Sequence, residues 1–210
     1  MIEKVLENLK KNNMDVYYLE TKEEVVPMVE KLMAEGSTVS VGGAMTLQET
    51  GVMDLLRSGK YNFLDRVRPG ITPEEVKQVY RDTFSADTYL CSANAITEQG
   101  ELVNVDGNAN RIAALLYGPD QVIVVAGVNK IVPDVESGFK RIKEIAAPLN
   151  TKRLNCATYC YEKGVCMGLE GGMTAGCGSA QRICRNYLVC GPQRTPGRIK
   201  VLLVNEKLGY

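Results

Sequence analysis

The sequence predicts an α/β fold in which a mostly parallel sheet is flanked by helices. Three observations predict it: short apolar segments alternate with amphipathic ones, 45% of the 210 residues are apolar, and no internal repeat or low-complexity linker interrupts the pattern. Apolar runs without polar alternation are typical of strands buried on both faces of a sheet, and parallel strands need helical crossovers. The apolar content also argues against a disordered chain.

Local signals place the elements of the first half of the chain. Apolar residues at helical spacing predict a helix over 1–12, and short apolar runs predict strands over 16–19 and 38–41. Three Thr-x-x-Glu patterns predict helix starts, because the threonine and glutamate side chains can bond the free amides of a first turn. The threonines are Thr21, Thr46 and Thr72.

The second half continues the alternation. The turn at 98–100 joins strands over 95–97 and 102–105 into an antiparallel hairpin. The other expected elements are a strand over 89–91, a helix after the 106–108 turn, a strand over 121–126, a helix over 133–146 and a closing strand over 199–204.

Cysteine placement divides the chain. Of seven cysteines, only Cys91 precedes residue 156, and the other six fall within 156–190. We therefore expect an α/β domain over 1–150, a cysteine-rich metal-binding segment over 151–196, and a closing strand of the α/β domain within 197–210. The middle segment is rich in glycine and poor in periodic apolar residues, so we expect it to fold around a bound group.

Composition excludes several classes of function. The chain has no histidine, which excludes Ser-His-Asp and Cys-His catalysis and leaves only cysteine or carboxylate ligands for a metal. Lysine plus arginine and aspartate plus glutamate both number 25, so no net charge favours nucleic acid or an anionic membrane. No apolar run reaches the about 18 residues of a membrane span, and the charged N-terminus does not resemble a signal peptide. We expect a cytoplasmic protein with reduced thiols.

The six clustered cysteines indicate a metal site. Four thiolates can hold an iron–sulfur cluster or a zinc ion, although no gap between these cysteines is the x2 of zinc ribbons or bacterial ferredoxins. Basic residues outnumber acidic ones by eight to two between 151 and 200, which favours thiolates. Buried free cysteines without a metal are the alternative. The pattern is Cys156-x3-Cys160-x5-Cys166-x10-Cys177-x6-Cys184-x5-Cys190.

A glycine pair between the strand over 38–41 and the following helix indicates an anion site. Glycines let backbone amides converge at the start of a helix, where phosphate, carboxylate or a nucleotide can bind. The motif is neither a P-loop nor GxGxxG, and the alternative is a tight turn with a helix cap. The residues concerned are Gly42, Gly43, Ala44, Met45 and Thr46.

Polar loops at other strand ends extend this site, because ligands of open α/β sheets gather beyond the carboxyl ends of the strands. Arg111 and Lys130 would hold a carboxylate or phosphate, and Glu49, Asp106 or Lys130 would serve as acid or base. Ordinary cap and turn chemistry is the alternative for each loop. The expected ligand-binding residues of these loops are Asn94, Asn104, Asp106, Asn108, Asn110, Arg111, Asn129 and Lys130.

Several segments together resemble the LUD domain of the lactate-utilisation family. They are 92–98, 100–104, 106–111, 124–132, 146–155, the Gly42–Glu49 region and the closing Leu208-Gly209-Tyr210. The resemblance implies a fold similar to that of ribose-phosphate isomerases and CoA transferases, in a cytoplasmic bacterial protein. Some family members take part in oxidising L-lactate to pyruvate alongside iron–sulfur partner subunits, and many stand-alone members have no settled reaction.

The cysteine segment resembles the tail of stand-alone members, C-x5-C-x2-C-x6-C ending in Arg-Ile-Cys. Cys160-x5-Cys166 and Cys177-x6-Cys184 match it, as does Arg182-Ile183-Cys184, but the middle gap is x10. Cys156 and Cys190 are additions, and either is an alternate ligand. The resemblance implies that Cys160, Cys166, Cys177 and Cys184 hold one [4Fe–4S] cluster, with zinc as the alternative.

Three hypotheses of function follow. The first is an iron–sulfur redox protein that acts on or binds a small anionic metabolite, such as a 2-hydroxy acid, and exchanges electrons with an iron–sulfur partner protein. The second is a binding module that holds a metabolite without turnover and is closed by a structural metal. The third, which rests on fold analogy alone, is a phospho-sugar or CoA-ester enzyme.

Overall fold

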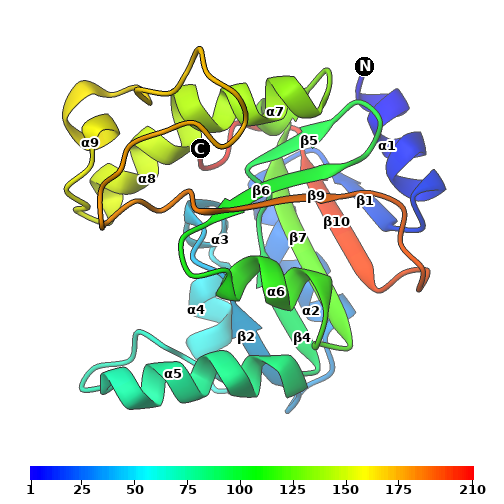
Figure 1. Ribbon diagram of the computed structural model, residues 1–210. Coiled ribbons are helices and arrows are strands. Elements are labelled where there is room, and N and C mark those ends of the chain that lie inside the picture. The colour runs from blue at the N-terminus through cyan, green and yellow to red at the C-terminus, as the bar shows by residue number, and fades with distance from the viewer.

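The computed structural model describes residues 1–210 and confirms the α/β fold (Figure 1). Its main sheet has six strands in the order β1-β10-β7-β4-β2-β3, and every neighbouring pair is parallel. The strands are β1 (Asp15–Leu19), β2 (Thr38–Val41), β3 (Asn62–Phe63), β4 (Thr88–Cys91), β7 (Gln121–Gly127) and β10 (Ile199–Val204).

Helices cover both faces of this sheet, which explains the unbroken apolar runs of its central strands. In β7, Val122 and Val124 pack on one face with α1 (Ile2–Lys11) and α6 (Asn110–Leu116), while Ile123 and Val125 pack on the other. The helices of that second face are α2 (Val25–Leu32), α3 (Met45–Glu49) and α4 (Val52–Arg57). None of the helices combines the length and the apolar composition that crossing a bilayer requires.

The expected hairpin belongs to a second, four-stranded sheet. Its order is β8-β5-β6-β9, and β6 pairs antiparallel with both β5 and β9. Strand β9 comes from the cysteine-rich segment, and its Cys190 lies opposite Leu102 of β6. The strands are β5 (Ala95–Thr97), β6 (Leu102–Asp106), β8 (Ile131–Val132) and β9 (Asn186–Cys190).

Two of the three expected capping boxes form. Thr72 caps α5 (Pro73–Asp82), and Thr21 opens a 3₁₀ turn over Lys22–Glu24 that leads into α2. The expected box at Thr46 is wrong, because α3 begins at Met45 and the Thr46 hydroxyl accepts a hydrogen bond from the Lys130 ammonium instead. Two further 3₁₀ turns cover Thr83–Ser85 and Val128–Lys130.

Residues 135–153 form one continuous helical stretch. Helix α7 (Val135–Arg141) passes through a π turn (Ile142–Ala146) into α8 (Ala147–Arg153), so the boundary expected at 150 lies inside α8. Helix α9 (Tyr159–Lys163) follows, and these helices gather with the cysteine-rich loops at one end of the molecule, opposite α5 (Figure 1). The cysteine-rich segment is therefore integrated with the α/β body at both of its ends.

Candidate functional site

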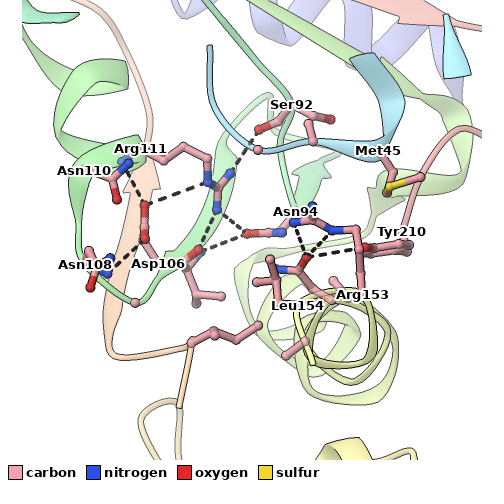
Figure 2. A pocket seen from close by; sticks show the side chains of 18 of the residues that line it. Met45, Ser92, Asn94, Asp106, Asn108, Asn110, Arg111, Arg153, Leu154 and Tyr210 are labelled. Atoms are coloured by element: carbon pink, nitrogen blue, oxygen red, sulfur yellow. Dashed lines mark hydrogen bonds and ion pairs between the residues drawn. The ribbon is translucent and has the colours of Figure 1, made fainter. Parts of the chain in front are cut away.

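Three adjacent strands of the main sheet bring the site together. The carboxyl ends of β2, β4 and β7 lead to Gly43, Ser92 and Lys130, and all three residues line a cavity of about 220 Å³ (Figure 2). This is smaller than the about 300 Å³ and more that drug-sized ligands occupy, and it suits a small metabolite. The expected site residues that line it are Gly43, Ala44, Met45, Asn94, Asp106, Asn108, Asn110, Arg111 and Lys130.

Lys130 is the buried cation of this cavity. Its side-chain ammonium donates to Ser92 Oγ at 2.8 Å and to Thr46 Oγ1 at 3.0 Å, and the residue is only 2% exposed. No carboxylate forms an ion pair with it. Burial, reinforced by the nearby cations Arg141 and Arg111, lowers the pKa of Lys130 to about 7. Lys130 can therefore gain and lose a proton near neutral pH.

Arg111 has a different role from the one expected. Both of its terminal nitrogens are satisfied within the chain, and its Nε lies 3.9 Å from the Asp106 carboxylate (Figure 2). Asp106 in turn accepts from the Arg111 backbone amide at 2.9 Å. Arg111 therefore stiffens the cavity wall, and its Nη protons are already engaged. The acceptors are Ser92 O and Asn104 Oδ1 for Nη1, and Asn94 Oδ1 and Val105 O for Nη2.

Gly42 and Asn104, which were expected to contact a ligand, lie behind the cavity wall. A Cβ on Gly42 would stand 2.8 Å from Tyr89 Oη and 3.0 Å from Arg111 Cδ, so the glycine permits close packing behind Arg111. Asn104 is fully buried and uses its side-chain oxygen as an acceptor for Arg111. Both residues therefore support the side chains that line the cavity.

Glu49, Asn129 and Thr46 also act from outside the cavity. The Glu49 carboxylate accepts from the Gly209 amide at 2.6 Å, and the Asn129 side chain bonds Gly209 O and the Leu208 amide. Thr46 bonds Lys130 as described above. Glu49 and Asn129 thus secure the C-terminal residues beside the cavity, where Tyr210 forms part of the lining.

Sequence reasoning missed six polar or aromatic lining residues. They are Arg66, Tyr80, Ser92, Asn150, Arg153 and Tyr210. Arg66 and Tyr80 belong to no motif, and only the folded chain brings them to the cavity. The other four lie in the 92–98, 146–155 and 208–210 segments that carry the family resemblance, which was the one sequence signal that could have found them.

A second, apolar cavity holds the four cysteines matched to the family tail. Cys160, Cys166, Cys177 and Cys184 all line it, whereas Cys156 and Cys190 do not. All seven cysteines of the chain are free thiols. Their surroundings include the apolar side chains of Phe139, Ile142, Met167, Met173 and Tyr187.

Hydrogen-bond donors approach three of these four sulfur atoms. The Gly168 amide lies 3.4 Å from Cys166 Sγ, Arg182 Nε lies 3.4 Å from Cys184 Sγ, and the Thr158 hydroxyl lies 3.4 Å from Cys160 Sγ. Burial raises the pKa of the Cys184 thiol, and the bond from Arg182 acts in the opposite direction. Donors of this kind stabilise thiolates that ligate a metal centre.

Lys143 organises the loop that carries Cys166. The lysine comes from the π turn and is 8% exposed, and its ammonium donates to the carbonyls of Gly168, Gly171 and Gly172 at 2.6, 3.1 and 2.8 Å. Its own carbonyl accepts from the Cys166 amide at 3.1 Å. One buried cation therefore holds a stretch of loop that has no regular secondary structure.

The two cavities share a wall. Ala147 lines both of them, while the neighbours Ile183 and Cys184 line the polar and the apolar cavity respectively. The next residue, Arg185, donates its amide to Asp106 O at 3.0 Å. The cysteine loop is thus attached directly to the polar loop that fixes Arg111.

The side chains do not form a ready-made site for a single metal ion. No group of three or more cysteine, aspartate or glutamate side chains is placed to hold one. The four cysteines of the apolar cavity line one shared space.

The chain belongs to the LUD domain family, whose model matches residues 2–204. A solved structure described as a DUF162 family protein from Deinococcus radiodurans is 14% identical, with a TM-score of 0.54, and the match covers 98% of this chain and 96% of that one. This likeness supports the fold. A match to eIF2B beta from Chaetomium thermophilum, 16% identical over 54% of this chain and 43% of that chain, has a TM-score of only 0.37. A search of curated proteins finds no match.

Proposed function

We propose that this LUD-domain protein is an iron–sulfur redox protein that acts on a small anionic metabolite of the 2-hydroxy acid type. The observation that carries the proposal is the shared wall between the two cavities. Four free cysteines line the apolar cavity, and a buried lysine lies on the floor of the polar one. A redox centre on one side of Ala147 would lie next to a substrate on the other side.

We propose a four-iron cluster as the bound group, with a zinc ion as the alternative. Tetrahedral zinc with Zn–S bonds of about 2.3 Å would need its four sulfurs within about 4 Å of one another. The ligands of a four-iron cluster lie farther apart, because each thiolate binds a different iron. The apolar lining and the donors to sulfur also suit an iron–sulfur centre. Cys160, Cys166, Cys177 and Cys184 would hold it.

Accommodating a cluster requires the loop to move outward. The apolar cavity has about 20 Å³ of space that water can reach, which is room for about one water molecule. The exposed methionines Met167 and Met173 border it from turns outside regular secondary structure. These flexible side chains can move without breaking a helix or a strand.

The residues of the polar cavity would bind the metabolite and move its proton. Lys130, with its lowered pKa, can accept the proton of a substrate hydroxyl, while Ser92 and Thr46 hold its amine in place. The surrounding arginines favour a carboxylate. A cluster in the neighbouring cavity would supply one-electron transfer.

Two further parts of the proposal concern the surroundings of the protein. Oxidation of a 2-hydroxy acid to a 2-oxo acid releases two electrons and two protons. Lys130 would take the hydroxyl proton, the hydrogen on the second carbon would leave as a proton to water, and a second redox protein, such as an iron–sulfur partner, must accept both electrons. We place the reaction in the cytoplasm, because clustered reduced thiols are typical of reducing compartments.

Metal analysis after anaerobic purification tests the redox centre. We expect about four iron atoms and four acid-labile sulfides per chain, lost in Cys166→Ala and in Cys184→Ala. Cys156→Ala is the matched control, since Cys156 lies in the same segment but outside the cavity, and it should keep the full complement. Stoichiometric zinc in place of iron would support a binding module with a structural metal and would refute the redox proposal.

Turnover is tested separately with L-lactate and an artificial electron acceptor. We expect acceptor reduction by the loaded protein and its loss in the Cys184→Ala variant. Loaded protein that reduces no acceptor with lactate or any related 2-hydroxy acid would refute the enzymatic part of the proposal.

A further inference from the structure

We infer that the polar cavity selects small 2-hydroxy acids that carry a second anionic group, and that Arg66, Arg153 and the backbone at Gly43 bind that group. The inference deepens the proposed function and rests on it, since it concerns the ligand of the same cavity. A simple monocarboxylate such as lactate would leave this second subsite empty.

Two guanidinium groups approach the same point at Gly43. The Nη2 atoms of Arg66 and Arg153 lie 3.1 and 3.7 Å from the position that a Cβ on Gly43 would take. Arg66 comes from the loop after β3, Arg153 from the end of α8 and Gly43 from the end of β2, so three separate parts of the chain converge. A side chain at position 43 would fill the space between these cations, and glycine leaves it open.

Arg66 is held in position and still has free donors. Its Nη1 donates to Val41 O at 2.6 Å, and its guanidinium carbon lies 5.7 Å from the centre of the Tyr80 ring. Neither contact uses Nη2, which is the atom nearest Gly43. The stacked arginine is therefore oriented in advance for an anion.

Arg153 completes the pair from the opposite wall. Its Nε and Nη2 both donate to Asn150 Oδ1, at 3.0 and 2.8 Å, which leaves Nη1 and a second Nη2 proton available. The Tyr210 hydroxyl contacts the same oxygen at 3.4 Å (Figure 2). Asn150 and Tyr210 thus place Arg153 at the cavity without neutralising it.

No acidic side chain neutralises either arginine. Arg66 and Arg153 form no ion pair, and the backbone amides of Gly43 and Ala44 donate no hydrogen bond within the chain. Two neighbouring cations and unpaired amides together favour an anionic oxygen group between them. Arg111, in contrast, has its donors satisfied internally and leaves this role to the other two.

The size of the cavity limits the ligand. A volume of about 220 Å³ also has to hold the end of the molecule that reaches Lys130 on the floor. The ligand is therefore a short acid, with its hydroxyl and one carboxylate toward Lys130 and Ser92 and its second anionic group toward Gly43. A second carboxylate and a phosphate ester share the chemistry that this subsite recognises.

A matched ligand series tests the inference by calorimetry on the purified, cluster-loaded protein. L-lactate, L-malate and the L enantiomer of 3-phosphoglycerate are 2-hydroxy acids of the same configuration and differ only in the group at the third carbon: hydrogen, carboxylate or phosphate ester. We expect malate or 3-phosphoglycerate to bind at least about tenfold more tightly than lactate. One or two charge-assisted hydrogen bonds between the second anionic group and the arginines provide a gain in affinity of this size. The ligand of the two that binds more tightly identifies the second group as carboxylate or phosphate.

Variants then assign the preference to the two arginines. Arg153→Met and Arg66→Met should each remove most of the preference, because each weakens the binding of malate or 3-phosphoglycerate far more than that of lactate. Arg153 is exposed and its side chain contacts only Asn150 and Tyr210, so its variant should fold normally. Arg81→Met on the exposed face of α5 is the matched control. Lactate binding without any preference for the doubly charged acids overturns this inference and leaves the proposed function standing. Failure of all three ligands to bind overturns both.

Discussion

The protonation of Lys130 gives the sharpest test of the site, because a buried amine without a carboxylate partner must affect stability in a pH-dependent way. The folded protein holds this amine with a pKa of about 7, compared with an ordinary value of 10.5. Below pH 7 both the folded and the unfolded states carry the charge, and the folded state bears the full cost of burying it. Between pH 7 and 10.5 the unfolded state binds more protons, so stability rises with pH across this window.

The magnitude follows from the shift. A difference of about 3.5 pKa units corresponds to about 5 kcal/mol at about 1.4 kcal/mol per unit, which is the largest gain expected between pH 6 and 11. Replacement of Lys130 by methionine removes the titrating group and leaves the Ser92 and Thr46 hydroxyls without their donor, at a cost of about 1–2 kcal/mol. We therefore expect Lys130→Met to be more stable than the natural chain at pH 6 and to lose this advantage toward pH 10.

Urea unfolding of the metal-free protein in reducing buffer, at a series of pH values from 6 to 10, measures this difference. The natural chain and Lys130→Met share every other titrating group, so subtraction isolates the lysine. Lys77→Met, on the exposed face of α5, should show no pH-dependent difference from the natural chain. Parallel stability–pH curves for the natural chain and Lys130→Met would show that Lys130 titrates normally, and the assigned acid–base role would then be untenable.

Three further substitutions test the supports of the two cavities. Lys143→Met leaves three loop carbonyls without their charged donor, so the free energy of unfolding in urea should fall by about 2–3 kcal/mol. Proteolysis of the 164–185 loop should also become faster. A loss of stability below about 0.5 kcal/mol would contradict the role assigned to this lysine. Gly42→Ala pushes a Cβ against Tyr89 Oη and Arg111 Cδ and should cost about 1–3 kcal/mol by the same assay. Tyr89→Phe removes a buried hydroxyl that has no hydrogen-bond partner, so it should leave stability unchanged or raise it. It should also reduce the loss of stability caused by Gly42→Ala, because the Cβ then meets no hydroxyl. Equal losses for Gly42→Ala in the natural chain and in Tyr89→Phe would disprove the contact between the added Cβ and Tyr89 Oη.

The sequence predicted the elements whose signals are local. The strands over 121–126 and 199–204 are long apolar runs, and the structure changes only the end of the first, to Gly127. The capping box at Thr72 was recognisable because both of its partners lie within one turn. At Thr46 the same local pattern was misleading, since Lys130, which is 84 residues away, takes the hydroxyl instead. A tertiary bond outcompeted a local one there.

The parts of the site that sequence reasoning missed depend on long-range convergence. Arg66 and Arg153 are 87 positions apart in the sequence, and only the folded chain places both beside Gly43. Strand β9 was missed for a similar reason: its residues look unremarkable within the cysteine-rich segment, and β6 provides the pairing that makes them a strand. Cys190, weighed as an alternate metal ligand because it adds to the family cysteine pattern, is buried in the core that α1 and α6 cover.

The pairing of β9 with β6 also bears on how the two halves of the proposed site communicate. Asp106, the last residue of β6, lies opposite Asn186, and its carbonyl also accepts from the Arg185 amide. Only Arg185 separates Cys184 from Asn186, so a displacement of Cys184 by a bound metal centre would be transmitted to the carbonyl of Asp106. The carboxylate of that same residue holds Arg111. The cysteine segment is therefore a structural part of the polar cavity, and in the proposed function a group bound by the thiolates would influence the geometry of that cavity.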